Sequence, residues 1–150
     1  MIAASGQVDA QPEAVFAFLA DLRNHWRLTD RWTRVVALDG AAPDGGTVRI
    51  HGPGGVRRTA RTRVVSSDPP RALQGEARVG RGTVGEVRWT IEPRDDATHV
   101  RLEAQVVRAS AGDRVLLALG GRWWLRRGFR AALRRLEEHV GRADRAARHH

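Results

Sequence analysis

The feature that most constrains the fold of this chain is a series of short segments in which apolar and polar residues alternate. In VRLEAQV (residues 100–106) every second residue is apolar, and the residues between them are polar or charged. The segments VGEVRWTI (84–91) and LQGEARV (73–79) alternate in the same way. Turn-forming residues separate these segments, which is typical of antiparallel strands joined by hairpins rather than of βαβ units. The sequence therefore predicts an antiparallel sheet with one apolar and one polar face.

Further strand and helix signals lie on the N-terminal side of these segments. Pro12 suits the first turn of a helix, where its missing N–H would have no partner, and Val15 and Leu19 follow at helical spacing. A second short helix or turn is expected at residues 24–30, which carry Trp26. The expected strands are Ile2–Val8, Trp32–Leu38, Thr47–His51, Val56–Val65, Leu73–Val79, Thr83–Ile91 and His99–Val107.

An amphipathic helix near the C-terminal end is the clearest single element. Its apolar stripe lies opposite a face rich in arginine, and it is the only predicted element large enough to cover the apolar face of the sheet. The stripe consists of Leu125, Phe129, Ala132, Leu133, Leu136 and Val140. We therefore expect an α+β protein in which this helix packs on the sheet.

The segment before this helix does not continue the same stripe. Leu119 and Trp123 fall on a different helical face, so we expect a bend or break at residues 120–121, a Gly-Gly pair with low helix propensity. Further upstream, Ser110 and Asp113 resemble a capping box, in which each side chain binds a backbone N–H of the first helical turn.

Length and composition limit the remaining alternatives. The 150 residues suffice for one domain with its own core, and we expect a single domain over residues 1–145 with a frayed tail at 146–150. The absence of cysteine excludes a disulfide framework and thiolate metal sites. Residues 1–10 lack the pattern of a signal peptide, and the apolar window 115–119 is too short to span a bilayer. These features predict a cytoplasmic protein without a membrane span.

The charge of the chain restricts its possible partners less than the length and composition restrict its fold. The net charge is +9, and all 26 basic residues are arginine. Such a balance makes nucleic acid or an anionic membrane surface plausible as a partner. The arginines are spread along the chain and interleaved with acids, however, which a G+C-rich genome would also produce. Nucleic-acid binding through an arginine-rich face therefore ranks behind the alternatives below.

A strand ending in VDA (residues 8–10) is followed by PEAVF (12–16), by Asp21 and Trp26, then by several strands and the arginine-rich last helix. This order resembles the polyketide cyclase/START-like superfamily (SRPBCC), which also includes the birch-pollen allergens. The resemblance covers residues 2–140 by pattern and by no invariant motif.

The resemblance implies a helix-grip fold, a curved antiparallel sheet of about seven strands around a long C-terminal helix, with two short helices after the first strand. It also implies a cavity between sheet and helix, because members of the superfamily bind or transform sterols, lipids, polyketides and plant hormones. The superfamily shares no catalytic set, so the resemblance assigns no catalytic residue to this chain.

Motifs for catalysis are missing from the sequence. Gly80, Gly82 and Gly85 match G-x-G-x-x-G, but a strand rather than a helix follows them, so a hairpin turn is expected. There is no G-x-S-x-G elbow, no tyrosine and no carboxylate pair on an apolar strand face. The internal histidines show no spacing typical of metal ligands. We expect no metal or cofactor, and the sequence leaves open whether the protein is an enzyme.

Candidate ligand-binding residues are the bulky or polar residues expected on the apolar face of the sheet. In VRRTARTRV (56–64), successive side chains point to opposite faces of the strand. If Ala60 faces the apolar side, Arg58 and Thr62 face it too; in the opposite arrangement Arg57 and Arg61 would face it instead. An inward Arg58 could bind a ligand carboxylate or phosphate, or form an internal ion pair. On the sheet these candidates are Trp32, Arg58, Thr62, Thr83, Val87, Trp89 and Leu102. Leu119 and Trp123 are added from the helical segment around the expected break, and His25 and Trp26 are expected at the mouth of the cavity.

The expected function is the binding of a lipophilic small molecule, such as a lipid, quinone, sterol or polyketide, between the sheet and the C-terminal helix. The first alternative is an enzyme of the polyketide cyclase/aromatase or dehydratase type, for which Arg58 and His25 are the only candidate groups. The second alternative is an arginine-rich protein that contacts RNA or the ribosome, as one branch of the superfamily is thought to do. A monomer or homodimer is expected in each case.

Overall fold

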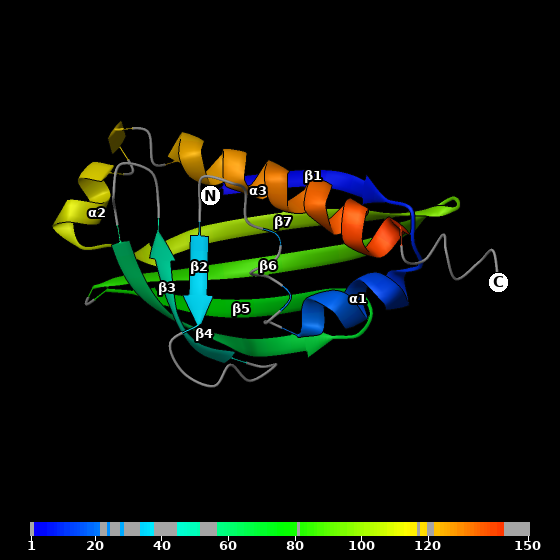
Figure 1. Cartoon of the computed structure of the whole chain (residues 1–150), viewed down its shortest axis with the longest axis horizontal. Coiled ribbons are helices and arrows are strands. Elements are labelled where there is room, and N and C mark those ends of the chain that lie inside the picture. The colour runs from blue at the N-terminus through cyan, green and yellow to red at the C-terminus, as the bar shows by residue number, and fades with distance from the viewer. Residues whose placement is uncertain are drawn as a thin grey trace.

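The computed structural model describes residues 2–21, 24, 28, 34–37, 45–51, 57–80, 82–116, 118–119 and 122–142. These residues form one antiparallel sheet of seven strands, with the helices gathered over one of its faces (Figure 1). The strands are β1 (Ile2–Val8), β2 (Arg34–Ala37), β3 (Gly45–His51), β4 (Arg57–Asp68), β5 (Ala72–Val79), β6 (Thr83–Arg94) and β7 (Ala97–Arg108).

The sheet is a meander to which the first strand is added beside the last. Its order is β1-β7-β6-β5-β4-β3-β2, and β1 pairs with β7 so that Ile2 lies opposite Ala104. The other strands follow in chain order. Strands β6 and β7 are joined by a tight turn at residues 95–96, in which Asp95 has a left-handed φ of 53°. The structure thus confirms the antiparallel meander that the alternating segments predict.

Helical segments accompany the sheet. Helix α1 (Pro12–Ala20) follows β1, and α2 (Ala111–Leu116) follows β7. Helix α3 (Arg122–Leu136) lies along β1 over the inner face of the sheet and continues into a π-helical turn, η4 (Glu137–Gly141). Helices α1 and α2 lie at opposite ends of the molecule (Figure 1).

The sheet curves around α3. The pairing of β4 with β5 shifts register between Val64 and Ser66, and the pairing of β6 with β7 shifts between Val84 and Gly85. At each shift one strand has one more residue than its partner, as in a β-bulge. An extra residue of this kind bends its strand and increases the local twist. A curved antiparallel sheet with the C-terminal helix in its concave side is the helix-grip fold that the resemblance implies.

The core lies between the inner face of the sheet and the helices. Helix α1 contributes Val15 and Leu19, and α3 contributes Leu133 and Leu136. The sheet contributes Val8, Leu73, Trp89, Ile91, Val100 and Leu102. Each such side chain is worth about 1.5–3 kcal/mol when fully buried. The alternation predicted for β7 is confirmed, because Arg101, between two of these core residues, is exposed.

Two sequence-based expectations about helices fall on residues that the structure does not describe. The break expected at residues 120–121 lies outside the described ranges, between α2, which ends at Leu116, and α3, which begins at Arg122. The second short helix expected at residues 24–30 also lies largely outside them. Among the described helices, none has both the length and the apolar character needed to cross a bilayer.

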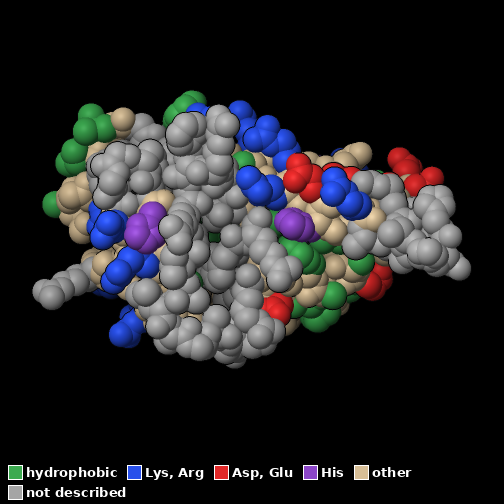
Figure 2. Space-filling view, in the orientation of Figure 1, with side chains coloured by type: hydrophobic (Ala, Val, Ile, Leu, Met, Phe, Trp, Pro, Cys, Tyr) green, Lys and Arg blue, Asp and Glu red, His purple; other side chains and the backbone are tan. Residues whose placement is uncertain are grey.

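Arginine side chains are prominent on the visible face of α3 (Figure 2).

Candidate functional site

The inner face of the sheet, opposite α3, carries the candidate ligand-binding residues. On β4, Ala60 is 1% exposed, whereas its neighbours Thr59 and Arg61 are exposed. Side chains two residues apart in a strand point to the same face, so Arg58 and Thr62 lie on the face of Ala60. Burial in the folded sheet therefore selects the inward phase for Arg58, which the sequence alone leaves open.

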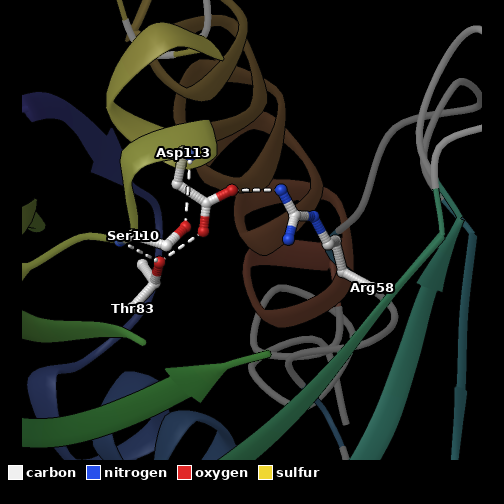
Figure 3. A network of polar contacts seen from close by, with 4 residues as sticks. All are labelled: Arg58, Thr83, Ser110 and Asp113. Atoms are coloured by element: carbon white, nitrogen blue, oxygen red, sulfur yellow. Dashed lines mark hydrogen bonds and ion pairs between the residues drawn. The ribbon is translucent and has the colours of Figure 1, made fainter. Parts of the chain in front are cut away.

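A polar network joins this face to α2 (Figure 3). The Asp113 carboxylate, in the first turn of α2, accepts one hydrogen bond from the Arg58 guanidinium and another from the Thr83 hydroxyl. The Thr83 hydroxyl in turn accepts the backbone N–H of Ser110 at 3.2 Å. Ser110 Oγ accepts the backbone N–H of Asp113 at 3.3 Å. Strands β4 and β6 and helix α2 are thus linked by residues from three segments that are distant in sequence.

The network is a partly buried ion pair. The Asp113 side chain is 13% exposed and that of Arg58 is 35% exposed. A carboxylate removed from water to this extent needs a cation and hydrogen-bond donors, and Arg58 and Thr83 supply them. In the described part of the chain, the guanidinium of Arg58 makes no second hydrogen bond, although it has five N–H donors. Arg58 can therefore hold Asp113 and still donate to a ligand.

Gly80 lies beside this guanidinium at the end of β5. Its backbone N–H donates to the Thr59 carbonyl at 3.0 Å, and its φ of 60° lies in the left-handed region that favours glycine. A Cβ at this position would lie 3.7 Å from Nη1 of Arg58, which is an ordinary van der Waals contact, so the backbone conformation and not a lack of space favours glycine here. The glycine therefore ends β5 with a turn toward β6, beside the ion pair. This agrees with a hairpin turn, rather than a dinucleotide loop, for the G-x-G-x-x-G match.

Asp113 is the site residue that sequence reasoning missed. The predicted capping box forms only in half, since Ser110 Oγ binds the Asp113 N–H but the Asp113 carboxylate turns toward the sheet. The Ser110 N–H finds the Thr83 hydroxyl instead. The available signal was an acid in a helical turn directly after a strand, together with an inward arginine. That signal could be used only once the phase of β4 was known.

The inner face becomes less buried toward α2. Along β7, Val100 and Leu102 are 0% and 3% exposed, whereas Val106 is 38% exposed. Along β6, Trp89 belongs to the core, Val87 is only partly buried against it, and Thr83 joins the polar network. Thr83 and Trp89 are about 20 Å apart along the strand at the usual rise per residue. The site therefore combines a packed apolar end, a more open middle and a polar end.

The other expected site residues are placed as follows. Thr62 donates a hydrogen bond to the Gly46 carbonyl at 3.4 Å, which links β4 to β3. Leu119 and Trp123 are 79% and 64% exposed, so most of each side chain lies in solvent instead of on the inner face. Their helical face differs from the buried stripe of α3, which is the physical reason. Three further expected residues, His25, Trp26 and Trp32, lie outside the described residues.

The outer face of the sheet carries a shallow hollow of about 190 Å³. A typical ligand pocket measures roughly 300–1,000 Å³. The hollow is lined by Gln74, Glu86, Val87, Arg88, Glu103, Ala104 and Gln105. Within the described ranges, no three His, Asp or Glu side chains gather in a way that could hold a metal ion. The inner face thus remains the better candidate for binding a lipophilic molecule.

Solved structures share this fold at low sequence identity. A START superfamily protein from Mycobacterium smegmatis is 15% identical with a TM-score of 0.64, covering 95% of this chain and 97% of that one. A protein from Thermus thermophilus is 19% identical with a TM-score of 0.65 and the same two coverages, 95% and 97%. A protein from Chromobacterium violaceum is 13% identical with a TM-score of 0.65, covering 94% and 99%. At such identities the likeness shows the fold alone.

Sequence comparison goes further than structural likeness. No curated protein matches the chain significantly. A family described as polyketide cyclase / dehydrase and lipid transport matches residues 2–141, which is nearly the whole chain and includes every element of the sheet and α3. The chain therefore belongs to the polyketide cyclase/dehydrase and lipid transport family.

Proposed function

We propose that the protein binds a lipophilic small molecule between the inner face of the sheet and α3, with the polar end of the ligand at Arg58, Thr83 and Asp113. The observation that carries this proposal is the polar network at the open end of an otherwise apolar inner face. A lipid, quinone, sterol or polyketide-like molecule has the matching shape, a long apolar body with a polar end. The family description, which joins polyketide chemistry with lipid transport, supports the same class of ligand.

Arg58 is the group that would recognise the polar end. Its guanidinium donates to Asp113 and has further N–H groups for a ligand carboxylate or carbonyl. Hydrogen bonds between charged partners are shorter and about twice as strong as those between neutral ones. The apolar body of the ligand would lie toward Val87 and Trp89, where removal of its surface from water favours binding.

A dye-displacement screen with fatty acids, sterols, quinones and aromatic polyketides tests this proposal. Binding by at least one class is expected. Arg58→Ala should then weaken binding of a carboxylate ligand about tenfold or more, because a hydrogen bond to a charged group contributes about 1.5–3 kcal/mol. Binding of the corresponding alcohol should change much less. Arg61→Ala is the matched control, since Arg61 lies on the same strand but on the exposed outer face.

Arg58→Ala also deprives Asp113 of its cation, so the variant needs a second comparison. The double variant Arg58→Ala/Asp113→Ala removes the whole ion pair, and its thermal unfolding shows whether the fold is intact. It should bind the carboxylate ligand as weakly as the single variant. If the protein bound none of the fatty acids, sterols, quinones and aromatic polyketides, the proposal would be wrong. Equal losses for the acid and the alcohol, or an equal loss in Arg61→Ala, would remove Arg58 from its role.

A cyclase or dehydratase is the second candidate function. It is favoured by the position of Asp113, a mostly buried carboxylate that faces the open end of the inner face beside Arg58. A carboxylate within hydrogen-bond reach of an acidic C–H group could act as a general base in ring closure or dehydration. Mass spectrometry of a poly-β-ketone after incubation with the protein separates the two functions. A product lighter by one water supports the enzyme, whereas unchanged ligand supports binding alone.

A further inference from the structure

The exposed apolar side chains of the protein are concentrated in one segment. Among the described residues, six large apolar side chains are exposed. Five of them, Val106, Val107, Val115, Leu119 and Trp123, lie between the end of β7 and the start of α3, and only Val65 lies elsewhere. Figure 2 shows hydrophobic side chains at the α2 end of the molecule. Single exposed apolar residues need no explanation, but a local concentration indicates an interaction site.

Arginines continue this surface along α3. Trp123, Arg127, Arg130 and Arg134 occur at positions i, i+4, i+7 and i+11, which places them on one face of the helix, and all four are exposed. The Arg127 guanidinium lies over the Trp123 ring, 5.6 Å from its centroid. The opposite face of the helix holds the buried Leu133 and Leu136. We call Val115, Leu119, Trp123, Arg127, Arg130 and Arg134 the α2–α3 patch.

The charge near this patch is strongly unbalanced. Residues 114–136 contain seven arginines and neither aspartate nor glutamate. The nearest acid on the N-terminal side, Asp113, points inward to Arg58. Glu137 and Glu138 follow directly, about one helical turn beyond Arg134, so the positive field is strongest between Arg114 and Arg130, where it would attract a surface of negative charge.

We propose that the α2–α3 patch docks the protein on the surface of an anionic lipid bilayer. A bilayer interface offers acyl chains for the exposed Val115, Leu119 and Trp123 and lipid phosphates for the arginines. Arginine stems can lie along the apolar boundary while their guanidinium groups remain in the headgroup layer. Nucleic acid would satisfy the arginines but offers no comparable partner for the exposed aliphatic side chains, so the bilayer fits the whole patch better.

Docking at this patch would bring the open end of the inner face close to the membrane. Helix α2 carries Val115 on its exposed surface and Asp113 on its inward side, so the patch and the polar network belong to the same short element. This consequence rests on the proposed function, because it supposes that a lipophilic ligand enters or leaves near α2. Binding to the bilayer itself does not require a ligand.

Sedimentation of the full chain with vesicles tests the docking surface. We expect the protein to sediment with vesicles of phosphatidylcholine and phosphatidylglycerol in equal amounts, and much less with phosphatidylcholine alone. Arg127→Gln/Arg130→Gln should weaken binding to the anionic vesicles about tenfold or more. Leu119→Ala/Trp123→Ala should weaken it by a similar factor, because the apolar contacts with the interface are lost. Circular dichroism verifies that each variant is folded, as expected for changes at exposed positions.

The control is Arg61→Gln/Val65→Ala, which removes one exposed arginine and one exposed apolar side chain from β4 and should leave vesicle binding unchanged. Arg127→Gln/Arg130→Gln should leave ligand binding in the absence of vesicles unchanged, and this separates the docking surface from the ligand site. The proposal is overturned by absence of binding to anionic vesicles or by an equal loss in the β4 control. A further outcome would also overturn it. If Arg127→Gln/Arg130→Gln loses affinity for both anionic vesicles and single-stranded RNA while Leu119→Ala/Trp123→Ala loses none, the surface recognises phosphate alone.

Discussion

Thr98 contributes to the fold through a single buried hydroxyl. Its side chain is fully buried at the beginning of β7, and Oγ1 donates a hydrogen bond of 2.6 Å to the Ala10 carbonyl. This bond joins the last strand to the segment between β1 and α1. A backbone carbonyl in such a position has no access to water, so the hydroxyl determines whether it is satisfied.

Thr98→Val keeps the shape of the side chain but leaves the Ala10 carbonyl without this donor. We expect the free energy of unfolding to fall by about 1–3 kcal/mol, the usual cost of a buried polar group left unsatisfied. Urea unfolding at neutral pH measures the change. Thr59→Val on the exposed face of β4 is the control and should alter stability by less than about 0.5 kcal/mol. Equal effects at both positions would show that the hydrogen bond is unimportant.

Glu76 on the outer face of β5 illustrates how neighbouring arginines change a carboxylate. A hydrogen bond from Arg78 holds the pKa of Glu76 below its usual value, and the nearby Arg63 adds to the effect, while partial burial opposes it. The two arginines lie 2.8 Å and 3.7 Å from the carboxylate oxygens. Because the pKa is lower in the folded chain, the ionised form favours folding above the unfolded pKa, and this contribution is lost as the pH falls through the folded value.

Glu76→Gln should therefore lower the free energy of unfolding relative to wild type at neutral pH. The difference between the two free energies should become smaller as the pH is lowered. The reason is that protonated Glu76 and glutamine are both neutral. Urea unfolding of wild type and variant over a pH series from neutral to below the pKa of Glu76 measures the difference. A difference in stability that stays constant with pH would contradict the role assigned to the charge.

At the scale of elements, the contacts described between the side chains of α2 and the sheet are hydrogen bonds and an ion pair. The helix is short, from Ala111 to Leu116, and its Val115 side chain is exposed. Such a helix is too short to be stable alone. Asp113 links it to Arg58 on β4 and Thr83 on β6. The stability of α2 should consequently depend on this one carboxylate.

Asp113→Ala is expected to release α2 locally without unfolding the sheet. Amide hydrogen exchange should become faster in residues 111–116, while exchange in the middle of β5, β6 and β7 stays close to wild type. Mass spectrometry of peptides after exchange measures both regions. Asp96→Ala, in the exposed turn between β6 and β7, is the control. Unchanged exchange in α2, or an equal increase throughout the sheet, would show that Asp113 does not hold the helix.

On the scale of the whole molecule, packing and function are separated along the sheet. Near α1, Val15 and Leu19 close a well-packed core with Ile91 and Val100. Near α2, Val106 at the end of β7 is exposed and a polar network replaces apolar packing. Stability comes mostly from the first end, which leaves the second end free to bind a ligand and a membrane surface, as proposed above. This division suits a binding protein because the residues that contact a ligand are seldom those that pack best.

The sequence by itself determined the local features of this protein. The buried faces of β5, β6 and β7, the positions of the strands and the buried stripe of α3 follow from periodicity within short segments, and local periodicity is set by backbone geometry. The change of helical face between Leu119 and Leu125 predicts a break before α3. The helix-grip fold was implied by the resemblance of this order of elements to the polyketide cyclase/START-like superfamily.

Only the tertiary structure decided which residues meet. Arg58 and Asp113 are 55 positions apart, and their contact depends on the phase of β4, the curvature of the sheet and the direction in which α2 leaves β7. None of these is written in a local pattern, since each results from packing over the whole sheet. The same packing left Trp123 on the solvent side of α3 and Trp89 in the core, although both are apolar aromatics in the sequence.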